Sequence, residues 1–491
     1  MSGAAPFERP RRRGAAGEAP GGGGRAARRW TVGDVVVDAL ARAGVGRLYA
    51  AGGVLAAALA EPARRGDLPL TAVGAAPTAC LMAAVTARIC GRPAAVVLSG
   101  ASTAEAASAL AHATLDRAPV IVLADAPGAM SAGVKGTVPL EPASAAHWVA
   151  HALQRAIAEP PGPMHVAVTA EGLGAAAVPV ATAVRSVGAA VEPAVLDDAA
   201  ARIAAATRPV AIAGIGCRDA DGAAWLRPFA EALPAPVVTT ARARGALPDP
   251  HPLNVGPLGS TAAAAVLARA DLIVALGVDV LETPEATWPD TPVVDVGPAV
   301  DDAGRPVALV RVRGAVAAVL EELAPRLRAR PRADWDVAEL DRLKRGGAPR
   351  AVSREAALVA LARQALPAGA VAAADQPYAA ALSAAWQAVG PHELLAPLAP
   401  GVRGFGAAAA VAARLARPAA PAIAFAVPGA ATDAALEVAA GLAVPVVAVM
   451  LGAGALPRGV PIAQARPPER FPAALAQALG ARGPIVLDAR E

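Results

Sequence analysis

The stretch from Val73 to Asp125 constrains the fold more than any other part of the chain. It contains two short apolar runs, Ala94–Leu98 and Pro119–Ala124, each bounded by turn residues, as buried parallel strands are. Segments of helical length lie on both sides of the first run, at Thr78–Cys90 and from about Thr103 to Leu115. Strand, small-residue turn and helix form the unit in which α/β proteins place ligands at the carboxyl ends of strands.

The same alternation of short apolar strands and helical segments recurs along the 491 residues, which is enough chain for two to four domains. It predicts an α/β protein of three domains, each with a mainly parallel sheet flanked by helices. Shifts in composition place the boundaries. We predict a basic, disordered tail at 1–29, domains at 30–185, 193–325 and 351–491, and a charged linker at 326–350.

The net charge of +4 comes from the tail rather than from the body of the chain. Residues 1–29 hold seven arginines and two glutamates, a net charge of +5, which leaves −1 for the remaining residues. A body without a net positive charge argues against nucleic acid as a partner. No apolar run of signal-peptide type follows the arginines, so we do not expect the tail to direct export.

The cysteines and an uncharged stretch in the last domain indicate a cytoplasmic protein that does not cross a membrane. Cys80, Cys90 and Cys217 are scattered among apolar residues, so we expect small buried thiols rather than disulfides or metal ligands. Residues 438–457 have the length of a membrane span and carry no charge, but a glycine and a proline interrupt them. We interpret this segment as the end of a buried helix followed by a strand.

The stretch from Val73 to Asp125 also matches a known family pattern, in order and without a gap. The matching residues are Val73, Ala79, Met82, Ala83, Ala87, Arg88, Gly91, Pro93, Ser99, Gly100, Asp116 and Pro119. The stretch resembles the N-terminal, pyrimidine-binding domain of thiamine-diphosphate enzymes of the acetolactate synthase and pyruvate oxidase type.

Further motifs of this family follow along the chain at the right spacing. RPVAIAGIGC at 208–217, the PVVTT…HP segment within 235–256 and ADLIVALGVD at 270–279 resemble its central domain. GVRGFGAAAAVAARLARP at 401–418 resembles a motif of its diphosphate-binding domain. The resemblance covers nearly all of 30–491 and implies the three-domain fold, with thiamine diphosphate and Mg²⁺ as the cofactors.

The resemblance also assigns residues to a cofactor pocket. On the family's pattern the pocket would be lined by Gly53, Ser99, Gly404, Gly429 and Ala430.

The residues that carry the family's chemistry are replaced in this chain. The glutamate that protonates the aminopyrimidine ring falls on Ala76, and the two Mg²⁺ ligands, an aspartate and an asparagine, fall on Pro428 and Ala453. A Gly-Gln pair that helps to bind the diphosphate is replaced by Pro377 and Tyr378. Mg²⁺ requires hard oxygen ligands, which neither Pro428 nor Ala453 has in its side chain. The sequence therefore predicts no intact catalytic residue and no intact metal ligand.

The central domain carries no signal for a flavin. Relatives that bind FAD use an arginine two residues after the glycine of their LGxR motif, and here Asp279 stands at that position. We therefore expect the central domain to be structural.

The sequence is compatible with three functions, and in one of them the chain is not an enzyme. In the first, the chain is a degenerate family member that acts as a partner subunit or binding protein. In the second, it is an active carboligase or decarboxylase of 2-oxo acids with relocated ligands. In the third, it is a scaffold reused for a different small-molecule reaction. Glu105 and Asp433 are the candidates for relocated carboxylates. A helix-capping or solvated role is the alternative for both.

The resemblance also implies an assembly. Family sites form where the first domain of one chain meets the third domain of another, which predicts a homodimer, a homotetramer or a heteromer with an intact family member. The small-residue segments Ala79–Val85 and Ala407–Ala413 fit such an interface, and packing inside one chain explains them equally well.

Overall fold

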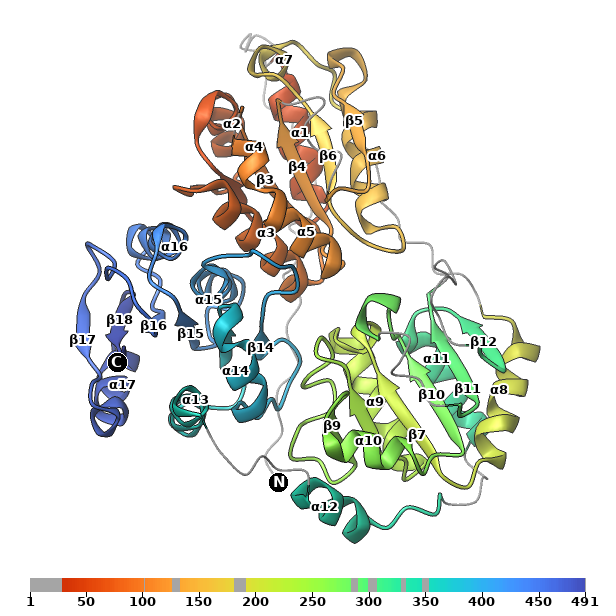
Figure 1. The fold of residues 1–491 in the computed structure, drawn as a ribbon. Helices are drawn as coiled ribbons and strands as arrows, with labels where there is room; N and C mark the ends of the chain where they lie inside the picture. The colour runs from red at the N-terminus through yellow and green to blue at the C-terminus, as the bar shows by residue number, and fades with distance from the viewer. Residues whose placement is uncertain are drawn as a thin grey trace, which may run out of the picture.

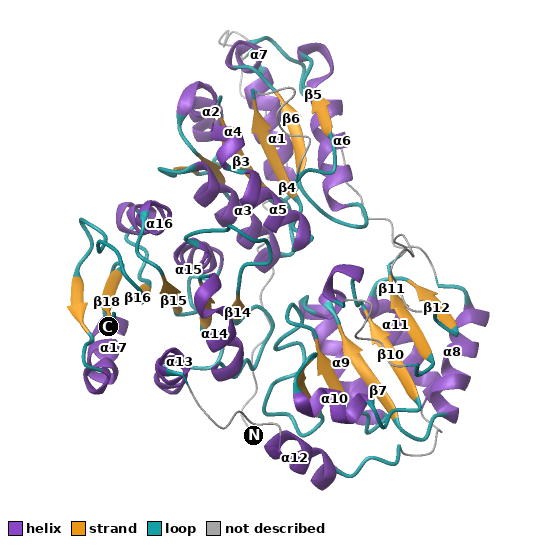
Figure 2. Ribbon diagram, viewed as in Figure 1, coloured by secondary structure: helices purple, strands orange, loops and turns teal. Residues whose placement is uncertain are grey.

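The computed structural model describes residues 29–100, 102–125, 133–180, 191–283, 290–298, 307–327, 333–346 and 353–490. These residues form three separate six-stranded sheets whose strands pair in parallel, each with helices packed against it (Figures 1 and 2). The predicted fold class is confirmed. All but the last residue of the predicted basic tail lies outside the described residues, so its disorder stays a prediction.

The first domain has the strand order β2-β1-β3-β4-β6-β5. Its strands are β1 (Leu48–Ala50), β2 (Leu70–Ala72), β3 (Ala94–Leu98), β4 (Val120–Ala124), β5 (Thr137–Pro139) and β6 (Met164–Ala167). Its helices are α1 (Val32–Arg42), α2 (Gly53–Arg65), α3 (Ala76–Cys90), α4 (Ser102–Glu105), α5 (Ala107–Leu115), α6 (Ala145–Ile157) and α7 (Ala170–Gly174).

Two helices of this domain differ from the sequence prediction. Helix α3 begins two residues early, because Pro77 sits in its first turn, where a backbone N–H would have no intrahelical partner. The single helix expected from about 103 to 115 is interrupted at Ala106, which separates α4 from α5. No helix-breaking residue stands at Ala106, so the residue type gives no account of this interruption.

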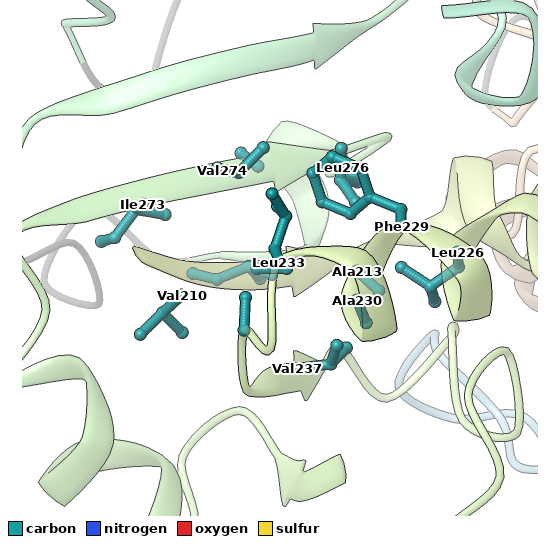
Figure 3. Packing of buried hydrophobic residues seen from close by; sticks show 14 of the residues in the cluster. Val210, Ala213, Leu226, Phe229, Ala230, Leu233, Val237, Ile273, Val274 and Leu276 are labelled. Carbon is teal, nitrogen blue, oxygen red and sulfur yellow. The ribbon is translucent and has the colours of Figure 1, made fainter. Parts of the chain in front are cut away.

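The central domain has the strand order β12-β11-β10-β7-β8-β9, which is the order of doubly wound dinucleotide-binding folds. Its strands are β7 (Pro209–Ala213), β8 (Val237–Thr239), β9 (Asn254–Pro257), β10 (Leu272–Leu276), β11 (Val293–Gly297) and β12 (Val310–Arg313). Its helices are α8 (Pro193–Ala205), α9 (Ala220–Ala232), α10 (Thr261–Leu267) and α11 (Val316–Leu323). Leu226 and Phe229 of α9 pack against the strands in Figure 3.

The segment expected to be a linker contributes to this domain. Helix α12 (Val337–Gly346) lies against it in Figure 1, and Trp335 and Leu340 are buried in the central core. The Trp335 indole donates to the Pro209 carbonyl at 3.0 Å, and the Arg208 guanidinium lies 4.6 Å from the centre of its ring. Much of the charged segment is therefore packed structure rather than a free connection.

The C-terminal domain repeats the topology of the first, with the order β14-β13-β15-β16-β18-β17. Its strands are β13 (Val371–Ala374), β14 (Leu394–Leu395), β15 (Ala422–Ala426), β16 (Val447–Met450), β17 (Ile462–Gln464) and β18 (Ile485–Asp488). Its helices are α13 (Arg354–Ala365), α14 (Ala379–Ala385), α15 (Phe405–Ala416), α16 (Ala430–Gly441) and α17 (Phe471–Leu479). Helices α3 and α15 occupy equivalent places, since each precedes the third strand of its sheet.

These equivalent helices pack against each other and join the first and third domains. We call this contact the alanine seam; one core cluster contains Ala79–Val85 of α3 together with Ala407–Ala413 of α15, all almost fully buried. Small side chains let two helix backbones approach closely over their whole length. The use of these two segments as an interface between chains is therefore corrected, because they meet inside one chain. The predicted assembly itself stays a prediction.

Three smaller expectations have a definite outcome. Cys80 and Cys217 are buried as expected, whereas Cys90 is exposed, because it is the last residue of α3. The uncharged segment at 438–457 is the end of α16 followed by β16, as predicted. Within the described ranges, no helix is long and apolar enough to cross a membrane.

Candidate functional site

The candidate site lies at the carboxyl ends of adjacent strands in the C-terminal sheet. Strands β13, β15 and β16 are neighbours, so the loops that follow them meet at one edge of the sheet. In open parallel sheets, this edge is where ligands bind. The loops contain the predicted pocket residues Gly429 and Ala430, together with Pro428 and Ala453.

A buried carboxylate fixes two of these loops to the start of a helix. Asp375, which follows β13 and is 2% exposed, accepts the backbone N–H of Gly406 at 2.9 Å and that of Val427 at 2.7 Å. Burial raises the pKa of Asp375, and these backbone donors oppose that rise. Because both carboxylate oxygens accept backbone N–H groups, Asp375 orders the loops and has little capacity left for a cation.

Gly404 allows α15 to begin directly beside α16. It has φ +67°, and a methyl group there would lie 2.6 Å from the Ala431 side chain and 2.9 Å from the Thr432 nitrogen. Both the left-handed backbone and the close approach require glycine. The structure thus brings Gly404 together with the turn that contains Gly429 and Ala430.

The residues at the two predicted metal-ligand positions belong to loops in direct contact. The Pro428 side chain lies against Gly454, where a methyl group would be only 2.9 Å from the proline Cβ. Ala453 stands beside Gly454 and is exposed, and Gly452 approaches the Tyr378 hydroxyl. Neither Pro428 nor Ala453 places a side-chain oxygen there.

The first domain contributes a second group of predicted pocket residues. Gly53, at the start of α2 with φ +82°, lies against Ser99, so a methyl group at Gly53 would be 2.5 Å from the Ser99 hydroxyl oxygen. That hydroxyl is buried and has no hydrogen-bond partner among the described residues. The next residue, Gly100, donates to Asp125 at 2.7 Å, which ties the loop after β3 to the loop after β4.

Ala76 begins α3 and is 2% exposed. Near this end of α3, the Thr78 hydroxyl donates to the Ala431 carbonyl at 3.3 Å, and Gly74 faces the Glu437 carboxylate of α16. The starts of α3 and α16 therefore meet across the two domains. Among the described residues, no hydrogen bond joins the Gly53–Ser99 pair to the Gly404 group.

The two candidate carboxylates differ in their surroundings. Glu105 is exposed on the short helix α4. Asp433 lies in the first turn of α16, and its Oδ1 atom is buried without a hydrogen-bond partner among the described residues. Burial, and then the neighbouring Glu437, raise the pKa of Asp433. Across the part of the chain that the structure describes, no three His, Cys, Asp or Glu residues are arranged to hold a metal ion.

Sequence reasoning missed the ordering role of Asp375 and the position of Thr78. Asp375 had a usable signal, since an acidic residue directly after a buried strand reaches the edge where loops gather. Thr78 had none, because its partner Ala431 is 353 residues away in the sequence.

The fold is that of a three-domain α/β protein whose loops gather at the carboxyl ends of parallel strands. Family models match residues 30–159, described as the thiamine pyrophosphate enzyme N-terminal TPP binding domain, and residues 196–323, described as the thiamine pyrophosphate enzyme central domain. Together they cover just over half of the chain. The chain belongs to the thiamine-pyrophosphate-dependent enzyme family, of the acetolactate synthase type.

Individual relatives match shorter regions. An acetolactate synthase of Mycobacterium bovis is 40% identical over 140 residues, which is 27% of this chain and 22% of that protein. A Pseudomonas aeruginosa protein named probable 2-ketoarginine decarboxylase is 31% identical over 226 residues, 40% of this chain and 39% of its own length. The chain thus matches about a fifth to two fifths of these relatives.

A solved structure extends the likeness in fold to almost the whole chain. The thiamine diphosphate-dependent 4-hydroxybenzoylformate decarboxylase of Rhodococcus jostii has a TM-score of 0.77 and 23% identity, covering 94% of this chain and 99% of that one. The family implies thiamine diphosphate as the cofactor.

Proposed function

We propose that this chain is an acetolactate-synthase-like family member that has lost Mg²⁺-dependent thiamine chemistry and acts as a non-catalytic or partner subunit. The observation that carries the proposal is the contact between the loops of Pro428 and Gly454. On the family's pattern this is where two oxygen ligands would hold Mg²⁺, and the side chains present are hydrocarbon.

The donor set does not fit the cofactor pair. Mg²⁺ needs near-octahedral oxygen ligands, and a diphosphate without its cation would bring uncompensated charge into a partly buried site, at a cost of several kcal/mol. Pro428 also lacks the backbone N–H that a phosphate-binding turn would use. At the other end of the pocket, Ala76 has no acid group and is buried. The residues present therefore do not support chemistry on thiamine diphosphate.

The proposal includes an assembly and a compartment. The chain forms a homodimer, a homotetramer or a heteromer with an intact family member. We propose a cytoplasmic location, supported by the free thiols of Cys80, Cys90 and Cys217.

The test restores the two predicted ligands. In the double variant Pro428→Asp with Ala453→Asn, we expect Mg²⁺-dependent binding of thiamine diphosphate to appear in calorimetric titration. The matched control, Pro428→Ala with Ala453→Val, changes shape at both positions without adding an oxygen and should not bind. If the double variant folds and still binds nothing, these two positions are not the lost metal site.

A second candidate function has its own supporting observation. Asp433 keeps a buried carboxylate oxygen without a partner among the described residues, and burial together with the neighbouring Glu437 raises its pKa. The alternative is an active carboligase or decarboxylase of 2-oxo acids, with Asp433 as a relocated carboxylate. If this alternative holds, the unmodified protein turns over pyruvate or another 2-oxo acid, and Asp433→Asn abolishes turnover. Glu105→Gln, an exposed control, leaves it unchanged.

A further inference from the structure

The junction of the three domains contains a buried group of basic side chains around a single aspartate. We call Arg88, His112, Asp116, Arg218, Arg242 and His392 the basic junction; the first three come from the first domain, the next two from the central domain and the last from the C-terminal domain. Asp116 and His112 are fully buried, and Arg88, Arg242 and His392 are 6 to 7% exposed.

Asp116 is held mainly by one arginine. Arg218 donates to the Asp116 Oδ1 atom at 2.6 Å and to its backbone carbonyl at 2.7 Å. Arg88 approaches the second oxygen, Oδ2, only at 3.6 Å, and its Nε atom donates to His392 at 3.3 Å. The arginines hold the pKa of Asp116 far below its usual range, against the effect of burial, so this carboxylate is ionised. Its Oδ2 atom nevertheless has no hydrogen-bond partner among the described residues.

His112 carries its hydrogen on a nitrogen that also lacks a partner. The Leu398 backbone N–H donates to His112 Nδ1 at 3.1 Å, so Nδ1 is an acceptor. Burial lowers the pKa of His112 to about 4, so the ring is neutral at pH 7. The hydrogen therefore sits on Nε2, which is buried without a hydrogen-bond partner in the described chain. His112 and Asp116 stand four residues apart on one face of the turns that end α5.

Arg242 adds a third buried atom of this kind, from the central domain. It follows β8, and its Nη1 atom is buried without a hydrogen-bond partner among the described residues. The negative charge of Asp116 favours the ionised form of Arg242, and the positive charge of Arg242 favours the neutral form of His112. Arg242 therefore interacts electrostatically with both residues.

The charges of the basic junction do not balance. Arg117 and Asp279 pair with each other at 2.6 Å and cancel. That leaves three arginines facing two carboxylates, Asp116 and Glu282, and burial raises the pKa of Glu282. The Glu282 oxygens are already occupied by the Thr240 hydroxyl at 2.5 Å and by backbone N–H groups. At least one positive charge is therefore without a counter-charge, which is costly in a buried site.

We propose that the basic junction binds a small, singly charged oxyanion that carries a hydroxyl group, such as dihydrogen phosphate or bicarbonate. Its oxygens accept from Arg242 Nη1 and His112 Nε2, and its hydroxyl donates to Asp116 Oδ2. One negative charge offsets the surplus arginine.

The experiment is calorimetric titration of the full-length protein with inorganic phosphate, bicarbonate and sulfate. We expect saturable binding of phosphate or bicarbonate, and weaker binding of sulfate, which has no hydroxyl to donate at neutral pH. Arg242→Met should weaken binding about tenfold or more, the usual effect of losing a hydrogen bond between charged groups. The matched control Arg345→Met, an exposed arginine of α12, should bind like the unmodified protein.

Three results would overturn the proposal. The first is the absence of saturable binding of either hydroxylated anion up to millimolar concentration, in which case water fills the site. The second is sulfate binding as tightly as phosphate. The third is unchanged anion binding by Arg242→Met. If Arg242→Met does not fold, Arg242→Lys serves instead, because it keeps the charge but loses the planar set of donors. Binding by that variant at full strength would count against the proposal in the same way.

Discussion

The loops of the candidate pocket and the basic junction differ in the kinds of side chain that they contain. The pocket loops after β15 and β16 consist mainly of proline, glycine and alanine and carry one charged residue, Arg458, and the nearby Asp375 carboxylate is bound to backbone N–H groups. The basic junction gathers charged and titratable side chains from three domains around Asp116. Charged side chains are thus dense where the three domains contact one another and sparse where a charged cofactor would bind. This difference supports a structural or partner role over thiamine chemistry.

Removing the central carboxylate of the basic junction should have the largest effect. Asp116→Asn keeps the shape but leaves Arg218 and Arg88 without their counter-charge, so we expect a loss of about 3 to 5 kcal/mol in the free energy of unfolding. Chemical denaturation measures it. The control Asp198→Asn breaks an exposed pair with Arg202 and should cost less than about 1 kcal/mol. Equal effects of the two substitutions would mean that the junction does not fix the domains.

The second prediction concerns how the free energy of unfolding changes as the pH falls. Because burial lowers the pKa of His112 to about 4, the unfolded chain takes up this proton at higher pH than the folded chain. Stability from this group is complete above about pH 6.5 and is lost as the pH falls from there to about 4, by roughly 3 kcal/mol. His392, whose pKa is also lowered by burial and by Arg88, acts in the same direction.

Unfolding measured between pH 7 and pH 4 tests this. His112→Gln should flatten the dependence, although it costs stability at pH 7, whereas the exposed His147→Gln should leave it unchanged. Asp116, whose pKa is lowered on folding, adds to the loss only below about pH 5, where the unfolded carboxyl begins to take up a proton, so the interval from pH 7 to pH 5 reports on His112. A pH profile identical in His112→Gln and the unmodified protein contradicts the assignment.

The alanine seam offers a smaller effect of a different kind. Ala409→Leu adds volume where α15 meets α3, and we expect a loss of about 1 to 3 kcal/mol from overpacking. Ala60→Leu on the exposed face of α2 should change stability by less than about 0.5 kcal/mol. Denaturant unfolding compares them. If Ala409→Leu is neutral, the two helices are not packed as closely as the structure indicates.

The sequence predicted the local elements well where a single signal determined them. Strand β3 was placed at Ala94–Leu98 because an apolar run there is bounded by turn residues, and α1 begins after Thr31, which forms a capping box with Asp34. Helix α12 was missed because charge dominates its composition and only Leu340 is buried among its residues.

The candidate site was predictable only in part. The family pattern named Gly53, Ser99 and Pro428, whereas the contacts of Gly53 with Ser99 and of Pro428 with Gly454 come from the structure alone. The basic junction had no such pattern. Asp116 and Arg218 are 102 residues apart in the sequence, and nothing in an isolated arginine indicates which buried carboxylate it will meet.

Calorimetric titration of the unmodified, full-length protein with thiamine diphosphate in the presence of Mg²⁺ tests the central claim most directly. A pocket without oxygen ligands at Pro428 and Ala453 predicts no Mg²⁺-dependent binding at physiological concentrations of the cofactor. Micromolar or tighter binding that depends on Mg²⁺ would contradict the account and favour the active enzyme.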